Sequence, residues 1–324
     1  MGHFEASLVL MAYNQEKFVR ESVSAALSQE GPPIEIVLSD DASTDNTFAI
    51  MQELSRAYTG RHVVKLNRNS ENLGIVAHYA KAVAMTSGRW IVQADGDDIS
   101  APNRVSRLMD EVRMHPDAAA VVSWFQVLHE DGTVEPSSLK HHRKMQAMQH
   151  WHMQDLLSSA RRGHGNFIVL GAAAAWRRDV FDDFPGFSND KDLYEDSILR
   201  WRALLLGRTY MIDDILVSYR RHIGSITNWG GLVDKSEAQS RRQRILFRSR
   251  KCWQFVREDF KYAESRGLIS RICLERALVE IDRNIAYLEA LIEWPLATSF
   301  RRLSFIARYW RFGIWRQVVS GLLT

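Results

Sequence analysis

The stretch that decides the fold runs from Arg89 to Asp98 and reads Arg-Trp-Ile-Val-Gln-Ala-Asp-Gly-Asp-Asp. Residues 89–94 form a short apolar run that predicts a buried strand, and Asp95, Asp97 and Asp98 follow at its carboxyl end. Unpaired carboxylates are costly to bury, whereas a hard divalent cation takes carboxylate and phosphate oxygens as ligands. Because ligands of open α/β sheets bind beyond the carboxyl ends of the strands, the cluster favours a metal–phosphate site. A solvated acidic turn is the alternative.

The residues before this stretch alternate between strand and helix patterns. Strands are expected at 7–11, 34–38, 63–66 and 89–94, with helices between them at 18–29, 46–58 and 76–86. This β-α-β-α-β-α-β order predicts an α/β fold with a Rossmann-like, mainly parallel sheet and helical crossovers.

The later residues follow a looser pattern. A helix is expected at 105–115, a strand at 118–128 with a hairpin turn near residue 131, a helix at 193–206 and a strand at 209–219. From residue 233 onward the pattern is helical, with segments at 235–265, 269–292 and 298–320. We therefore expect an α/β domain over 1–230 and an α-helical C-terminal region over 231–324.

The charge of the 324-residue chain is unevenly distributed. The net charge is +3, but residues 233–324 hold 18 Lys/Arg and 10 Asp/Glu, a net of +8, and residues 1–232 hold 24 and 29, a net of −5. This asymmetry indicates two regions with different partners. The N-terminus runs straight into a strand and no run of 18 uncharged apolar residues occurs, so we expect neither a signal peptide nor a spanning helix, and a cytoplasmic protein.

Six motifs over residues 7–222 resemble those of family 2 glycosyltransferases with the GT-A fold. The motifs are Ser7-Leu-Val-Leu-Met-Ala-Tyr-Asn14, Ser39-Asp-Asp-Ala-Ser-Thr-Asp-Asn-Thr47, Glu71-Asn-Leu-Gly74, Gln93-Ala-Asp-Gly-Asp-Asp98, Tyr194-Glu-Asp196 and Tyr219-Arg-Arg-His222. The resemblance implies an inverting transfer of a sugar from a nucleotide-diphosphate sugar. It also implies a divalent metal, Mn²⁺ or Mg²⁺, and UDP as the expected nucleotide, with thymidine or guanosine donors left open. Two departures are Ala12, where many relatives carry proline, and 75–81, which lacks the Arg-Asn pair common in other members.

The resemblance also implies the roles of individual residues. It makes Asp97 a metal ligand, Asp95 a contact to the ribose or to the metal and its waters, and His222 a second metal or diphosphate contact. Asp98 would orient the sugar or bind the metal through water, with capping of the next helix as the alternative. The implied donor contacts are Ala12, Tyr13, Asn14, Glu16, Asp40, Asp41, Asn72, Gly74, Lys81, Asp95, Gly96, Arg220 and Arg221. Helix capping is the alternative for Asp41, and a surface ion pair is the alternative for one of the two arginines.

The acceptor hydroxyl needs a base, because a sugar hydroxyl is a poor nucleophile at neutral pH. The resemblance makes Asp196 that base, with its neighbour Glu195 as the first alternative. The two residues open a predicted helix, where acidic side chains are common for electrostatic reasons alone. The residues by themselves therefore leave a purely structural role open.

The segment 300–316 is basic and aromatic. At 100° per residue, its arginines share one half of a helix and Leu303, Ile306, Trp310 and Ile314 share the other. This pattern is typical of a helix lying in the plane of an anionic membrane. It predicts a protein at the inner face of the plasma membrane. Together with the resemblance to glycosyltransferases, this position implies a glycan or lipid-linked acceptor in surface polysaccharide synthesis. Packing on the chain itself, or in a homodimer, is the alternative. No nucleic-acid motif occurs, so nucleic acid is not an expected partner.

Other function classes fit less well. A dinucleotide-dependent oxidoreductase is excluded because no Gly-x-Gly-x-x-Gly follows the first strand. A metal-dependent nucleotidyltransferase would carry a glycine-rich, basic phosphate loop there, whereas residues 12–16 contain neither glycine nor a cluster of basic side chains. A catalytically inactive, nucleotide-sugar-binding scaffold is the third alternative, and a turnover assay separates it from an enzyme.

Overall fold

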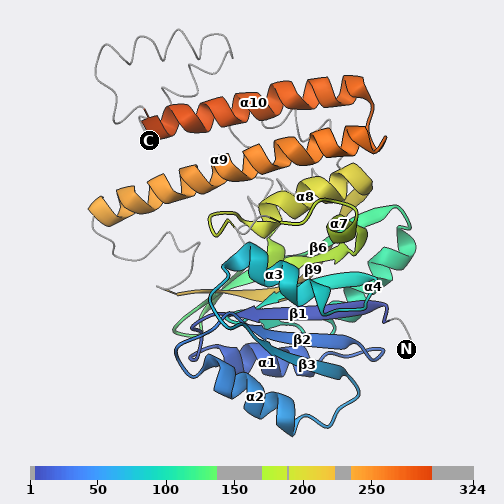
Figure 1. Ribbon diagram of the computed structural model, residues 1–324. Coiled ribbons are helices and arrows are strands. Elements are labelled where there is room, and N and C mark those ends of the chain that lie inside the picture. Colours follow the sequence, from blue (N-terminus) through green and yellow to red (C-terminus); the bar gives the residue numbers. More distant parts are fainter. Residues whose placement is uncertain (1–3, 137–169, 188–189, 223–234, 294–324) are drawn as a thin grey trace. The chain divides into compact units, whose positions relative to one another are not determined.

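The computed structural model describes residues 4–136, 170–187, 190–222 and 235–293 (Figure 1). The elements in chain order are β1 (Ala6–Ala12), α1 (Val19–Leu27), β2 (Glu35–Asp40), α2 (Thr47–Ala57), β3 (Val63–Arg68), α3 (Ile75–Ala84), β4 (Trp90–Asp95), β5 (Ile99–Ser100), α4 (Arg104–Met114), β6 (Ala118–His129), β7 (Val134–Pro136), η1 (Gly171–Ala173), β8 (Ala174–Arg177), α7 (Asp179–Asp182), α8 (Glu195–Leu206), β9 (Arg208–Arg221), α9 (Lys235–Ser265) and α10 (Arg271–Glu293).

The chain forms two compact units. The first comprises Met1–Trp151, Val169–Lys191 and Arg202–Gly231, and the second comprises His152–Ile168, Asp192–Trp201 and Leu232–Thr324. Within the described residues, no helix is both long and apolar enough to cross a membrane. The basic segment 300–316 lies outside the described residues.

The first unit is built on a mixed sheet with the strand order β3-β2-β1-β4-β8-β6-β9-β5, and β7 pairs with β6. Strands β1 to β4 are parallel, as the sequence predicts. Strand β8 runs antiparallel to both β4 and β6, while β6 and β9 pair in parallel. The α/β fold is confirmed, with the antiparallel pairing confined to the second half of the sheet.

The central strands are buried on both faces, which explains their nearly continuous apolar sequences. On one face, Leu8 and Leu10 of β1 join a core that includes Val23 of α1, Met51 of α2 and Leu108 of α4. Helix α3 lies on the opposite face, as Figure 1 shows for α3 relative to α1 and α2. Helices therefore cover both faces of the sheet, and the connecting loops lie at the two ends of the strands.

The strand register brings the acidic residues to one edge. Met11 pairs with Asp95 of β4, and Ala12 pairs with Asp40 of β2. Because β1, β2 and β4 are parallel, the loops that follow all three strands leave the sheet at the same edge. This edge carries the candidate site.

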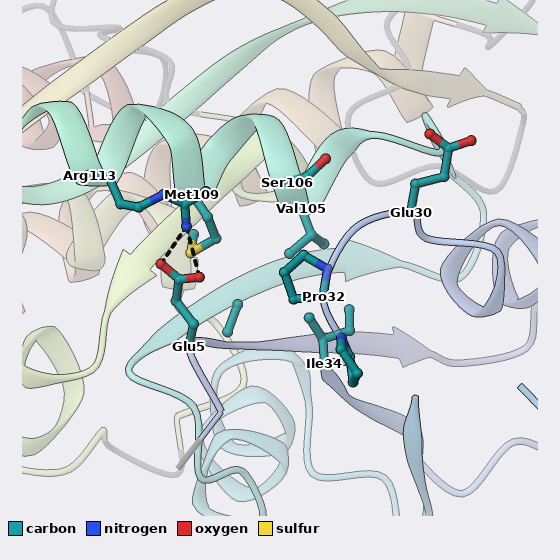
Figure 2. A pocket seen from close by; sticks show the side chains of 10 residues that line it. Glu5, Glu30, Pro32, Ile34, Val105, Ser106, Met109 and Arg113 are labelled. Atoms are coloured by element: carbon teal, nitrogen blue, oxygen red, sulfur yellow. Dashed lines mark hydrogen bonds and ion pairs between the residues drawn. The ribbon is translucent and has the colours of Figure 1, made fainter. Parts of the chain in front are cut away.

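The opposite edge holds a small pocket at the amino ends of β1 and β2 (Figure 2). Figure 2 shows the carboxylate of Glu5 paired with the guanidinium of Arg113 on one side of this pocket, at 2.7 Å. Pro32, Ile34 and Val105 supply apolar walls. The pocket lies at the far end of the strands from the acidic residues.

The second unit contains the paired helices α9 and α10. Arg257 of α9 donates to Asp282 of α10 at 2.8 Å, and Phe260 and Ile281 are fully buried. Trp201, in the part of α8 that belongs to this unit, packs edge-on against Phe260, with ring centroids 5.9 Å apart. The helical pattern predicted from residue 235 onward is therefore present through Glu293.

Candidate active site

The loops after β1 and β2 are joined by hydrogen bonds. The backbone N–H of Asn14 donates to Ser43 Oγ at 2.9 Å, and Asn14 Oδ1 accepts the N–H of Thr44 at 2.9 Å. Asn14 has φ of +52°, a left-handed conformation that asparagine adopts more readily than most residues. The N–H of Gln15 donates to Thr47 Oγ1 at 2.7 Å. This network holds the backbone that directly follows Tyr13, a residue that is 45% exposed.

Glu16 and Asp40 serve the same two loops. Glu16 Oε2 accepts both the backbone N–H and the side-chain amide of Asn46, at 3.0 and 2.9 Å. Asp40 Oδ2 accepts the N–H of Ser43 at 3.0 Å and lies 3.5 Å from Arg68 Nε. Its other oxygen is buried and has no hydrogen-bond partner within the part of the chain that the structure describes, which is costly for a carboxylate.

Asp41 organises the loop after β3. Its buried carboxylate accepts the side-chain amide of Asn69 at 2.8 Å and the N–H groups of Leu73 and Gly74, each at 2.9 Å. Gly74 has φ of +79°, and a Cβ there would lie 3.0 Å from Lys191 Cγ, so glycine is required for two reasons. Asp41 therefore fixes the loop that contains two of the predicted donor contacts, Asn72 and Gly74.

The turn after β4 brings together two residues that are far apart in the sequence. Asp97 Oδ2 and His222 Nε2 lie 2.9 Å apart although the two residues are 125 positions apart in the chain. Both side chains are largely buried, at 16% and 11% exposure, and the ring of Phe18 lies 4.6 Å from the imidazole. The sequence motifs at residues 93–98 and 219–222 thus meet at one point.

Asp98 has a different environment from Asp97. It is buried, and its Oδ1 accepts the N–H of Arg220 at 2.8 Å, while Oδ2 has no hydrogen-bond partner among the described residues. Burial raises the pKa of Asp98 well above its usual range, and the charges of Asp97 and Asp95 raise it further. Helix α4 begins at Arg104 with Asn103 at the N-cap position, so Asp98 does not cap that helix.

Arg220 holds this turn from the end of β9. Its Nε donates to the backbone oxygen of Asp97 at 2.9 Å, and its Nη2 donates to Glu21 Oε2 at 2.5 Å. The guanidinium also lies 4.9 Å from the centre of the Phe18 ring. Arg221 and Lys81, the other predicted basic contacts, are exposed.

The pair formed by Asp97 and His222 fits a divalent cation. Among the described residues, no group of three His, Cys, Asp or Glu side chains is arranged to hold a metal. Mg²⁺ and similar ions commonly keep one or two protein ligands and take the rest from phosphates and water, with bonds of about 2.1 Å. The 2.9 Å separation is that of a direct hydrogen bond between the two side chains. Their contacting atoms, a carboxylate oxygen and an imidazole nitrogen, are ligand types that divalent cations accept.

Glu195 and Asp196 belong to the second unit, where they form the first residues of α8. Asp196 Oδ1 accepts the hydroxyl of Ser197 at 3.3 Å. One helical turn later, burial lowers the pKa of Arg200, and the negative charge of Asp196 acts in the opposite direction. A backbone N–H from Tyr194 to Cys252 Sγ, at 3.3 Å, ties the start of this helix to α9.

Several residues of the site were not predicted from the sequence. Phe18 and Glu21 of α1 contact His222 and Arg220, and Gln15 Oε1 would lie 2.4 Å from a Cβ at Gly96. One sequence signal could have identified further site residues: a polar residue near the carboxyl end of a strand, such as Asn67 of β3. Nothing in the sequence pattern of α1 marks Phe18 or Glu21.

Comparison with known proteins agrees with this architecture. The family model for glycosyl transferase family 2 matches residues 7–184. An uncharacterised protein of Mycobacterium tuberculosis is 26% identical over 226 residues, which cover 68% of this chain and 60% of that protein. Glycosyltransferase GlyG of Streptococcus pneumoniae is 28% identical over 233 residues, covering 68% of this chain and 72% of its own.

Solved structures share the fold. The Staphylococcus aureus TarS fragment 1–349, in complex with UDP-GlcNAc, is 16% identical with a TM-score of 0.55, over 97% of this chain and 92% of that chain. The mannosyltransferase PcManGT of Pyrobaculum calidifontis, in complex with GDP-Man and Mn²⁺, is 16% identical with a TM-score of 0.57, over 99% and 83%. Since the family model covers more than half of the sequence, the chain belongs to glycosyl transferase family 2.

Proposed function

We propose that this protein transfers a sugar, with inversion, from a nucleotide-diphosphate sugar to an acceptor hydroxyl. The observation that carries the proposal is the pairing of Asp97 with His222 at 2.9 Å, at the edge where β1, β2 and β4 end. Two structural neighbours, one in complex with UDP-GlcNAc and the other with GDP-Man and Mn²⁺, support a nucleotide-sugar donor and a metal.

Different residues at this edge of the sheet would hold different parts of the donor. Tyr13, on a backbone fixed by hydrogen bonds, would stack on the base, and the loop held by Asp41 would border it. Asp97 and His222, with Asp95 near them, would hold the divalent cation. When bound, that cation stabilises the negative charge that develops on the diphosphate leaving group. Arg220 would keep Asp97 in place through its backbone oxygen.

Asp196 would act as the general base. It would accept the proton of the acceptor hydroxyl while the oxygen forms a bond to the anomeric carbon and the bond from that carbon to the diphosphate breaks. One base and direct displacement give inversion. Glu195 is the alternative base.

The acceptor and the site of action are further parts of the proposal. We infer a glycan or lipid-linked acceptor and a peripheral position at the inner face of the plasma membrane. The support is the sequence of residues 300–316, whose spacing predicts a helix with arginines on one half and Leu303, Ile306, Trp310 and Ile314 on the other.

Thermal-shift binding of UDP, GDP and dTDP, each with and without Mn²⁺, tests the donor site. We expect one nucleotide to raise the melting temperature in the presence of Mn²⁺, and Asp97→Asn to abolish that rise. Asp110→Asn is the matched control, because Asp110 forms an exposed ion pair with Arg113. If no nucleotide stabilises the protein, the donor site is refuted. If a nucleotide binds but its sugars are never transferred or hydrolysed, the protein is an inactive binding scaffold.

A further inference from the structure

A chain of hydrogen bonds, buried at both ends and half-buried at Asn67, runs from α3 to the carboxylate of Asp41. His78, on the buried side of α3, places Nε2 2.7 Å from Ser39 Oγ at the end of β2. Asn67, near the end of β3, donates its side-chain amide to Ser39 Oγ at 2.9 Å and to Asn69 Oδ1 at 3.1 Å. Asn69 in turn donates to Asp41 Oδ1 at 2.8 Å. The imidazole is therefore linked to Asp41 through three intervening side chains.

The backbone closes this chain into a ring. Asp41 Oδ2 accepts the N–H of Gly74 at 2.9 Å, and the N–H of His78 donates to the backbone oxygen of Gly74 at 2.9 Å. Helix α3 starts directly after Gly74 and carries His78. Gly74 and His78 both belong to the ring and are joined by the first turn of this helix. The ends of β2 and β3 and the start of α3 are thereby fixed relative to one another.

The imidazole suits this position because a buried polar network is stable when each of its groups has a partner. The Ser39 hydroxyl uses both His78 and Asn67. An apolar side chain at position 78 would leave that hydroxyl one partner short in the interior, at a cost in stability. Burial lowers the pKa of His78, which favours the neutral ring, although the charges of Asp41 and Asp40 act in the opposite direction.

We propose that His78 is a positioning residue of the donor site, which holds Asp41 and, through it, the loop from residue 69 to residue 74. The inference rests on the proposed function, because it assumes that this loop borders a nucleotide-diphosphate sugar. His78 itself does not touch the donor. Its effect on binding is transmitted by Ser39, Asn67 and Asn69.

The test compares two substitutions at position 78. His78→Leu removes the hydrogen bond to Ser39, whereas His78→Gln keeps a side-chain amide that can reach the same hydroxyl. His62→Leu is the matched control: His62 is also buried, accepts the N–H of Ile34 at 3.2 Å and donates to the backbone oxygen of Gln29 at 2.9 Å, but it lies at the amino ends of the strands. The two readouts are amide hydrogen exchange over residues 69–75 and calorimetric binding of UDP, GDP and dTDP with Mn²⁺.

In His78→Leu we expect exchange at Leu73 and Gly74 to be about tenfold faster and nucleotide binding to be about tenfold weaker, the effect of losing one buried hydrogen bond. His78→Gln should remain within about twofold of the wild type on both readouts. His62→Leu should lower the melting temperature but leave both readouts unchanged. If His78→Leu should fail to fold, Ser39→Ala breaks the same chain with a smaller loss of volume.

The outcomes separate the two proposals. If His78→Leu lowers the melting temperature but changes neither exchange nor binding, His78 is a core residue and the inference is wrong. If the wild-type protein binds none of the nucleotides, the proposed function fails. In that case faster exchange in His78→Leu would still establish the link from His78 to Asp41, but a role of His78 at a donor site would be refuted.

Discussion

Asp97 and Asp98 are adjacent in sequence, yet the structure gives them different chemistry. Asp97 faces an imidazole at 2.9 Å and keeps 16% of its side chain exposed. Asp98 is buried, and its raised pKa follows from burial and from the neighbouring carboxylates. A ligand for a cation has to be ionised and accessible, so Asp97 is the better candidate. This distinction depends on the position to which β9 brings Arg220 and His222. That position cannot be predicted from the sequence around Asp97 and Asp98.

Gly96, between Asp95 and Asp97, has no space for a side chain. A Cβ at this position would lie 2.4 Å from Gln15 Oε1, 2.8 Å from the Cβ of Ala12 and 3.1 Å from the backbone oxygen of Met11. The glutamine can move, but the other two atoms belong to β1. We therefore expect Gly96→Ala to lower the free energy of unfolding by about 1–3 kcal/mol and to weaken nucleotide binding, measured by denaturant titration and calorimetry.

Gly186→Ala is the control for this substitution, because among the described residues no atom, apart from those of its two chain neighbours, lies within 4 Å of the position that its Cβ would take. It should leave both stability and binding at wild-type values. Equal behaviour of the two variants would show that the turn after β4 can shift to accept a side chain.

At the scale of elements, the parallel half of the sheet could be predicted because β1, β2 and β4 are buried on both faces and separated by helices of ordinary length. Strand β8 could not, since its four residues, Ala174–Arg177, are too few for a period to show. The site follows the same division. Acidic residues at strand ends were predicted to lie together, but the contacts of Phe18 and Glu21, and the ring through His78, depend on side-chain packing between distant segments.

Glu35 joins several elements at the amino edge of the sheet. Its buried carboxylate accepts the hydroxyl of Ser7 at 2.6 Å and the N–H of Ser87 at 2.7 Å, and it pairs with Lys65 at 2.7 Å. Burial alone would raise the pKa of Glu35, but the hydrogen bonds from Lys65, Ser7 and Ser87 outweigh it and the pKa is lowered. The carboxylate therefore stabilises the fold in its ionised form.

We expect Glu35→Gln to lower the free energy of unfolding by about 1–3 kcal/mol at neutral pH. A lowered carboxyl pKa contributes stability above the unfolded-state value of about 4.3 and loses it as the pH falls through the folded-state value. The difference between variant and wild type should thus shrink in acid, as measured by urea titrations from pH 7 to pH 3. Glu5→Gln, which removes an exposed pair with Arg113, should change stability little at any pH. A pH-independent difference for Glu35→Gln would contradict the ionised role.

At the scale of the whole molecule, charge separates the chain into a part of net −5 over residues 1–232 and a part of net +8 over residues 233–324. The acidic part contains the candidate donor site, in which several carboxylates meet and a cation is the expected counter-charge. The basic part ends in a segment whose arginines would attract anionic lipid, by about 1 kcal/mol for each basic residue near the surface. Under the proposed function, this attraction would bring the protein to the membrane surface, where a lipid-linked acceptor would be found.

Co-sedimentation with vesicles tests this arrangement. We expect the full chain to bind vesicles that contain phosphatidylglycerol, to bind neutral phosphatidylcholine vesicles weakly, and to dissociate as salt rises from 0.05 to 0.5 M, a range over which the screening length falls by about threefold. Replacing Arg301, Arg302, Arg308, Arg311 and Arg316 by glutamine should remove the preference for anionic lipid while keeping the apolar half of the segment. As the matched control for net charge, the same number of arginines in α10 and α4 is replaced by glutamine. If both sets of substitutions reduce binding equally, attraction by overall charge accounts for the association, and the segment 300–316 has no special part in it.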